Sequence, residues 1–193
     1  FPERLTSGAA VALAFFSGRP SAVQRRLEEG TGLLREAGAK QVARLDQEEG
    51  RLLLRRLADL GWSVESRPYL GIKLGVPPTA VAQVAGSCRE DSSLGFPPGV
   101  VADPGFGTVR LYWWADSISN WIDESLVLGA IARIRELARN AGGTAVVEHC
   151  PLPLKKRIDI WGDPPPGMEL MRQVKQRFDP LGILNPGRFA GKI

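Results

Sequence analysis

The chain of 193 residues is poor in metal ligands and redox-active side chains. It has one histidine, His149, and two cysteines, Cys88 and Cys150, which are far apart in the sequence. Zinc and iron sites commonly use two or more imidazoles or thiolates, so this composition nearly excludes a histidine-based metal site. Cysteine-bound iron–sulfur clusters are excluded for the same reason. Two isolated thiols are typical of a reducing compartment, and we expect a cytoplasmic protein without a metal centre.

Long apolar runs and leader sequences are also missing. No stretch of about 18 apolar residues is present, which predicts that no segment spans a membrane. The chain begins with Phe1 and shows no basic segment followed by an apolar one, so we expect a piece of a longer protein and no signal peptide.

The charge balance is only weakly basic. The formal net charge is +4, and lysines and arginines alternate with glutamates, as in residues 25–29 and 133–136. Such mixing is typical of solvated helix faces and argues against nucleic-acid binding. An RNA-binding domain built on a basic, aromatic sheet remains an alternative, which failure to retain RNA at low ionic strength would exclude.

A glycine fingerprint for dinucleotides is lacking as well. Gly105-Phe106-Gly107 has no third glycine and falls in the turn of a predicted hairpin. Without a phosphate-cradling loop, the pyrophosphate of a dinucleotide has no evident site in this chain.

Periodicity predicts alternating strands and helices. The helix that begins after Asp46 has a capping box with Glu49, and a later long helix is expected to be capped by Ser119. Residues 88–98 are expected to form an exposed loop. The predicted buried helix residues are Leu52, Leu53, Leu57 and Leu60, and then Ile122, Leu126, Ile131, Ile134 and Leu137. Strands are predicted at 9–17, 41–45, 67–76, 100–102, 108–115 and 144–149, and helices at 20–38, 46–61, 77–84, 119–142 and 168–178.

Most of the predicted strands are apolar on one side only. This pattern favours an α+β fold, a mainly antiparallel sheet with helices on one face. Residues 9–16 are apolar on both sides, which keeps a doubly wound parallel sheet as the alternative.

One sheet face collects polar and aromatic side chains. Strand alternation places Arg110, Tyr112 and Trp114 together, opposite Val109, Leu111 and Trp113. We expect Tyr69, Lys73 and Glu148 to join them from neighbouring strands. Basic groups among aromatics suit a small carboxylate, because the guanidinium offers a bidentate fork. Alternatively, these are ordinary half-exposed sheet residues, with Tyr112 and Trp114 filling a core.

His149 is the one side chain that titrates near neutral pH, and it could act as a general base. A lone histidine at a strand end, before Cys150 and Pro151, is more often a surface or packing residue. The catalytic residues are unknown at this stage.

The tail carries the most specific motif. A helix ends at Asp179-Pro180, a short apolar pair follows, and Asn185-Pro186-Gly187-Arg188 forms a turn. Together with Ile158-Asp159-Ile160-Trp161-Gly162, this run resembles the C-terminal signature of FAD-linked oxidases of the vanillyl-alcohol-oxidase type. Within that family it is similar to the FAD-binding E subunit of bacterial glycolate oxidase.

The resemblance implies a ferredoxin-like cap (substrate) domain over residues 1–162 and a flavin-contacting helix and tail over 163–193. It also implies an FAD-binding domain that precedes this chain, with Asn185, Pro186, Gly187 and Arg188 as the flavin contacts. The parent protein is then an FAD-dependent oxidoreductase acting on a 2-hydroxy acid such as glycolate. We expect the 193 residues alone to fold, to bind FAD weakly or not at all, and to be inactive.

The partners implied by the resemblance are a D-type flavoprotein subunit and an iron–sulfur subunit, with attachment to the inner membrane through them as an alternative to a free cytoplasmic location. Related oxidases carry a histidine-rich metal motif that this chain lacks, so the related D subunit is a candidate for the catalytic one. A non-catalytic assembly module, which docks partner subunits, is the alternative from another functional class.

Overall fold

The structure is a computed structural model that describes residues 10–63, 67–114 and 123–193. The chain divides into two compact units, Phe1–Leu60 and Gly61–Ile193. The division into 1–162 and 163–193 expected from the resemblance concerns function rather than compactness, and it stays a prediction.

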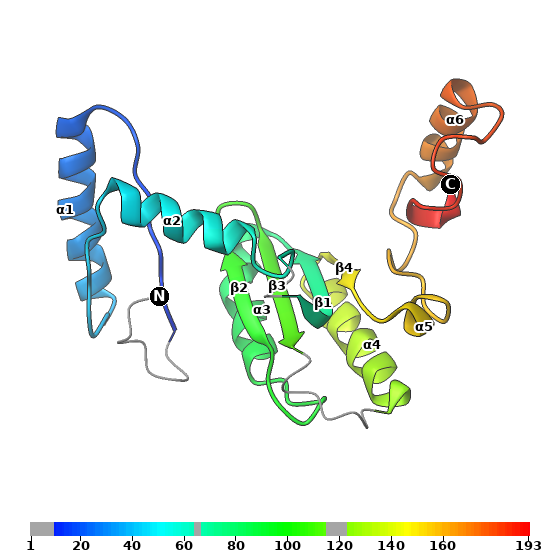
Figure 1. Ribbon diagram of the computed structural model, residues 1–193, viewed down its shortest axis with the longest axis horizontal. Coiled ribbons are helices and arrows are strands. Elements are labelled where there is room, and N and C mark those ends of the chain that lie inside the picture. The colour runs from blue at the N-terminus through cyan, green and yellow to red at the C-terminus, as the bar shows by residue number, and fades with distance from the viewer. Residues whose placement is uncertain (1–9, 64–66, 115–122) are drawn as a thin grey trace. The chain divides into compact units, whose positions relative to one another are not determined.

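The second unit contains a four-stranded sheet in the order β2-β3-β1-β4, in which every neighbouring pair is antiparallel. Figure 1 shows the strands, which span Pro68–Gly75 (β1), Gly99–Asp103 (β2), Thr108–Trp114 (β3) and Thr144–His149 (β4). With α3 (Val81–Arg89) after β1 and α4 (Glu124–Asn140) after β3, the order is β-α-β-β-α-β, the ferredoxin-like arrangement. The α+β prediction is confirmed, and the parallel-sheet alternative is wrong.

The core of this unit lies between one sheet face and the two helices, α3 and α4, which lie side by side against it (Figure 1). Alternation along β1 and β3 buries one side chain in two, as predicted from the sequence. The fully buried sheet residues are Leu70, Ile72, Leu74, Val109, Leu111, Trp113 and Val147, and the helices add Val81, Val84, Cys88, Val127, Ile131 and Ile134.

Three predictions about the helical part of this unit are wrong. Cys88 lies inside α3 and is buried, and Leu94 is buried too, so 88–98 is not an exposed loop throughout. The N-cap of α4 is Asp123, whose side chain accepts a hydrogen bond from the Ser125 amide. Ser119 and Ile122 lie outside the described residues. Leu126 is 53% exposed, whereas the next residue of the same turn, Val127, is fully buried, so Leu126 lies on the solvent side of α4.

The first unit contains α1 (Pro20–Glu36) and α2 (Gln47–Ala58), which begin where predicted and end two and three residues before the predicted ends. The Asp46–Glu49 capping box is present. Beyond the C-cap Ala37, Gly38 has a left-handed conformation, and the Ala39 amide donates a hydrogen bond to the Leu34 carbonyl. Neither helix has a buried residue, so the predicted burial of the α2 leucines is wrong.

The described residues of the two predicted N-terminal strands, 10–17 and 41–45, are not strands in the structure. Val11, Leu13 and Phe15 are exposed. An isolated apolar run can only become a strand by pairing with another one. The prediction of these two strands is wrong, because apolar composition does not show whether a segment has a partner strand.

Beyond β4, the chain forms a short helix, α5 (Leu152–Lys155), and then α6 (Met168–Phe178). The α6 helix has the predicted bounds, and the helix stops at Asp179-Pro180 because a following proline disfavours the α conformation. The end of the chain packs against the first residue of α6, because Gly191 lies against the Met168 side chain. Among the described residues, no helix has the length and apolar content to cross a membrane.

Candidate functional site

The sheet face that α3 and α4 leave uncovered, here called the open face, holds the polar residues predicted from strand alternation. Lys73 of β1 pairs in register with Arg110 of β3 on one side and with Val146 of β4 on the other. Tyr112 lies opposite Gly71, two residues along the same face. Their partners on the other face, Leu111 and Trp113, are fully buried in the core. Lys73, Arg110, Tyr112 and Trp114 therefore share one face.

The open face carries two neighbouring cations, Lys73 and Arg110, and one carboxylate, Glu148. Arg110 Nε lies 3.8 Å from Glu148 Oε2, and this ion pair reaches across β1. Lys73 is directly beside Arg110 and has no ion-pair partner among the residues that the structure describes. Like charges that oppose each other across strands repel. The cluster keeps a net positive charge, which favours an anionic ligand.

The aromatic side chains of the open face, Tyr112 and Trp114, pack against each other. Tyr112 is only 3% exposed, and its ring centroid lies 5.8 Å from that of Trp114. The chain crosses the ring at Gly61, where an added Cβ would come within 2.6 Å of a Tyr112 ring carbon. Burial raises the pKa of Tyr112, an effect that Arg110 opposes and Glu148 strengthens. Tyr112 is thus a covered neutral phenol that supports Arg110 and Glu148.

The structure places Tyr69 away from this group. A bulge between Pro68 and Leu70 interrupts the pairing of β1 with β3, so the alternation that assigned Tyr69 to the open face breaks there. Its ring packs against the core cluster. Burial raises the pKa of Tyr69, and Glu124 at the start of α4 adds to that shift. The expectation that Tyr69 joins Lys73 is wrong, because a bulge cannot be read from periodicity.

His149 lies at the edge of the open face as a packing residue. Its ring meets that of Trp62 edge-on, with centroids 4.8 Å apart, and it also lies against Gly71. The Nε2 atom is buried and has no hydrogen-bond partner among the described residues. Burial lowers the pKa of His149, so the imidazole is neutral near pH 7. Its buried ring nitrogen is poorly placed for proton transfer to a ligand.

A cavity of about 580 Å³ opens on this face beside Lys73 and Glu148. Its walls are largely apolar, which suits a small organic ligand with one charged end. Of the wall residues, Lys73 and Glu148 were predicted from strand alternation, and Ile160 and Trp161 were named only as part of the family motif. Trp62 was missed, since it lies in a turn and belongs to no periodic pattern.

The segment 159–162 is held in place from several sides. The Val147 amide of β4 donates to the Ile160 carbonyl at 2.8 Å. Arg135 of α4 donates to the Asp159 carbonyl. The Trp161 indole then donates to the Arg188 carbonyl at 3.1 Å, and its ring lies 5.0 Å from that of Phe189. Trp161 therefore joins the cavity wall to the tail.

The tail is organised around one carboxylate. Asp179 accepts hydrogen bonds from the amides of Ile183 and Leu184, at 3.0 and 2.9 Å, and its side chain is only 4% exposed. Lys175 donates to the same carboxylate, and this hydrogen bond together with the two amides lowers the pKa of Asp179. The aspartate of the tail motif thus stabilises the conformation of the tail.

The turn that follows presents polar side chains outward. Asn185 has φ of 48° and Gly187 has φ of 69°, and the Arg188 amide closes the turn on the Asn185 carbonyl at 3.2 Å. Both Asn185 and Arg188 are exposed, with no side-chain hydrogen bond among the described residues. A fixed turn with a free amide and a free guanidinium fits the polar edge of a flavin or a phosphate.

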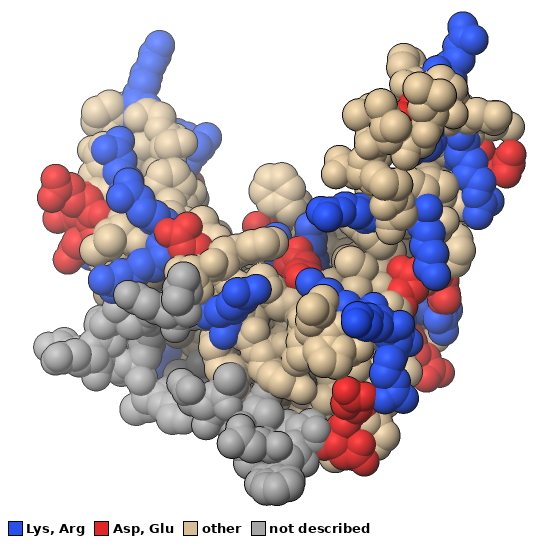
Figure 2. All heavy atoms as spheres, turned by 45° about the vertical axis from the view of Figure 1, so that its right-hand side comes forward, with Lys and Arg blue, Asp and Glu red and all other residues tan. Residues whose placement is uncertain are grey.

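Charged side chains of both signs are intermixed over the face of the molecule in Figure 2, without one large single-sign patch.

The environment of each of the two thiols makes it a poor nucleophile. Burial raises the pKa of Cys88 to about 12, and burial also raises the pKa of Cys150.

Comparison with known proteins agrees with the tail motif. No curated protein and no solved structure matches the chain significantly. Residues 3–189 match the family of FAD linked oxidases, C-terminal domain. This match spans nearly the whole sequence, and it implies FAD in the complete protein. The chain therefore belongs to the family of C-terminal domains of FAD-linked oxidases, as part of a flavoprotein oxidoreductase.

Proposed function

We propose that the chain is the cap and tail of an FAD-dependent subunit that oxidises a small 2-hydroxy acid such as glycolate. An FAD-binding domain that precedes this chain would hold most of the cofactor, and a D-type flavoprotein and an iron–sulfur subunit are the proposed partners. The chain alone would bind FAD weakly or not at all. Its proposed location is the cytoplasm or the inner-membrane surface, reached through those partners.

One observation carries the proposal. Trp161 lines the cavity that contains Lys73, and the same indole donates to the carbonyl of Arg188 in the outward-facing turn. The unpaired cation and the turn that fits a flavin edge are therefore linked by a single side chain. Such proximity is what an oxidase needs, because substrate and flavin must meet directly.

Lys73 and Arg110 are the proposed carboxylate-binding residues. Glu148 holds Arg110 by their ion pair, and Lys73 supplies a charge that pairs with no carboxylate in the described part of the chain. The apolar wall, with Val146 and Trp161, would exclude water and orient the carbon chain of the substrate. Asn185 and Arg188 would contact the flavin. When bound, FAD supplies the two-electron acceptor for the oxidation.

The test is kinetic and uses the full-length flavoprotein with Lys73→Met or Arg110→Met. Loss of one charged hydrogen bond costs about 1.5–3 kcal/mol, so KM for the hydroxy acid should rise roughly 10- to 100-fold. Flavin content and subunit composition should not change. Lys156→Met is the matched control, because Lys156 is exposed and does not line the cavity. Unchanged kinetics in both open-face variants would exclude the proposed substrate role.

An assembly module is the second candidate, and a different surface supports it. The α6 helix and the tail expose a group of large apolar side chains, of which Phe178 and Leu181 are 80% and 82% exposed. Contiguous apolar surface is commonly an interaction site. If assembly is the function, Phe178→Ser with Leu181→Ser dissociates the subunits, whereas Lys73→Met leaves both complex and turnover intact.

A further inference from the structure

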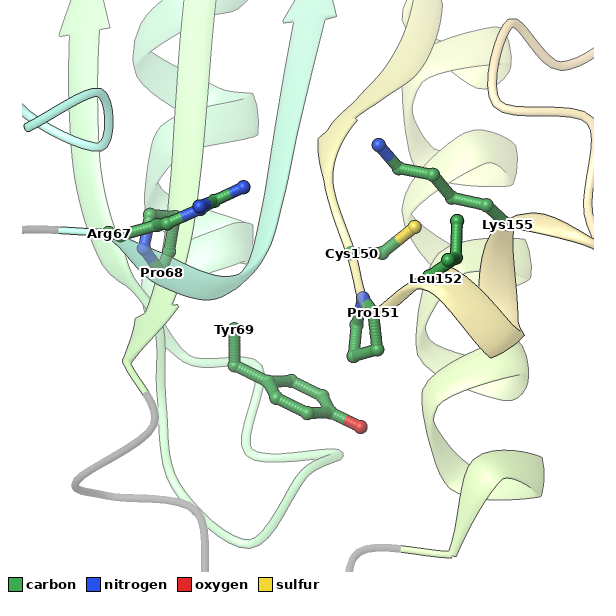
Figure 3. A pocket seen from close by; sticks show the side chains of 7 residues that line it. All are labelled: Arg67, Pro68, Tyr69, Cys150, Pro151, Leu152 and Lys155. Atoms are coloured by element: carbon green, nitrogen blue, oxygen red, sulfur yellow. The ribbon is translucent and has the colours of Figure 1, made fainter. Parts of the chain in front are cut away.

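A second cavity lies where β1 begins and the chain leaves β4. Its volume is about 370 Å³, and it is lined by Arg67, Pro68, Tyr69, Cys150, Pro151, Leu152 and Lys155. Figure 3 shows that these side chains come from two segments that are distant in sequence, residues 67–69 and 150–155. None of them lines the open-face cavity. The bulge that displaces Tyr69 brings its ring to this wall.

Among the described residues, the cavity is lined by two cations and by no carboxylate. Arg67 and Lys155 reach toward one another from opposite sides in Figure 3. Neither cation has an ion-pair partner among the residues that the structure describes. Two facing cations repel unless an anion lies between them.

Both cations also act on the neighbouring His149 ring. Burial lowers the pKa of His149 most, Glu148 opposes this, and Arg67 and Lys155 each lower it further. Both positive charges are thus close enough to act on one ring. The histidine is the only one among the 193 residues, so its titration reports on this region alone.

We propose that the cavity binds a small oxyanion, a phosphate or a carboxylate group, between the Arg67 guanidinium and the Lys155 ammonium. The guanidinium matches two anion oxygens with its planar fork, and the ammonium contacts a third oxygen or the remaining charge. Tyr69, Pro151 and Leu152 form the apolar surround, which strengthens the interaction by excluding part of the solvent. This proposal does not depend on the substrate role of the open face.

The experiment is an NMR titration of the complete 193-residue chain. The ring protons of His149 are followed while sodium phosphate or sodium acetate replaces sodium chloride at constant ionic strength. A bound anion offsets the two cations, so the pKa of His149 should rise and the shifts should saturate, with Kd in the millimolar range. Saturation by phosphate alone identifies a phosphate site, and saturation by acetate alone identifies a carboxylate site.

Charge-removing variants decide whether the effect is local. Arg67→Gln and Lys155→Gln should each weaken binding about fivefold or more, which corresponds to ~1 kcal/mol for an exposed ion pair. Lys156→Gln removes the same charge from the next residue, which does not line the cavity, and should leave Kd unchanged. The proposal is overturned if neither anion shifts His149, or if Lys156→Gln weakens binding as much as Lys155→Gln.

Discussion

Two helices of equal length behave differently in this chain. The α1 helix, Pro20–Glu36, and the α4 helix, Glu124–Asn140, each have 17 residues and similar amphipathic patterns. The α4 helix buries five residues, among them Ile131 and Ile134, against the sheet. The α1 helix buries none, although it is ended by a complete glycine motif. Local signals therefore determine where a helix forms, and a separate partner determines whether its apolar side is covered.

The same contrast applies to strands. The β1 strand has paired neighbours on both sides, and every second side chain is fully buried. Residues 10–17 are as apolar but pair with no strand in the described part of the chain, and Phe15 is 62% exposed. Because a single strand leaves its backbone groups unpaired, apolar composition alone does not stabilise it. The first unit thus contains well-formed helices without a core of its own among the described residues.

Truncating one apolar side chain in α4 and one in α1 tests this comparison with the largest expected effect. Ile131→Ala leaves a cavity in a closed core and should lower the free energy of unfolding by about 2–5 kcal/mol. Leu33→Ala, in α1, removes a side chain that is 65% exposed and should change it by less than about 0.5 kcal/mol. Chemical denaturation of both variants gives the two values. Equal destabilisation would mean that a further contact covers α1.

A glycine pair gives a smaller effect in the same direction. Gly61 and Gly38 have similar left-handed φ values, 81° and 86°, so alanine costs roughly 1–2 kcal/mol at either position. At Gly61 the new methyl group also meets the Tyr112 ring, which adds about 1–3 kcal/mol, whereas nothing lies within 4 Å at Gly38. The Tm of Gly61→Ala should therefore be well below the Tm of Gly38→Ala, and a reversed order of the two Tm values would contradict the packing of Tyr112 against Gly61.

The smallest effect is local and concerns the tail. The pKa of Asp179 is lower in the folded state than in the unfolded state, so the ionised carboxylate stabilises the folded tail. This stabilisation is complete above the unfolded pKa of about 3.9 and is lost as the pH falls through the lower folded pKa. The amide signals of Ile183 and Leu184 should therefore keep their folded positions at pH 5 and move together on further acidification. Asp179→Asn should weaken their hydrogen bonds at neutral pH, whereas Asp163→Asn, an exposed control, should not. Amide signals of Ile183 and Leu184 that do not move on acidification would contradict the role of Asp179 in anchoring the tail.

Much of the sheet unit could be predicted from the sequence, because its signals are local or periodic. Alternation identified Lys73, Arg110 and Tyr112 as one face, and the α6 bounds followed from Asp179-Pro180. The position of Tyr69 could not be predicted, since a bulge changes the alternation without a sequence signature. The link from Trp161 to Arg188 joins residues 27 apart through an indole and a carbonyl, a contact that only the folded chain specifies.

The central functional claim is that Lys73 and Arg110 bind a substrate carboxylate, and one comparison tests it directly. The full-length flavoprotein is assayed with a 2-hydroxy acid and with its uncharged amide, and the ratio of the two kcat/KM values is measured. We predict that the wild-type protein prefers the acid by roughly 10- to 100-fold, the worth of a charged hydrogen bond, and that Lys73→Met with Arg110→Met brings the ratio near one. A preference for the acid that persists unchanged in the double variant would contradict the account.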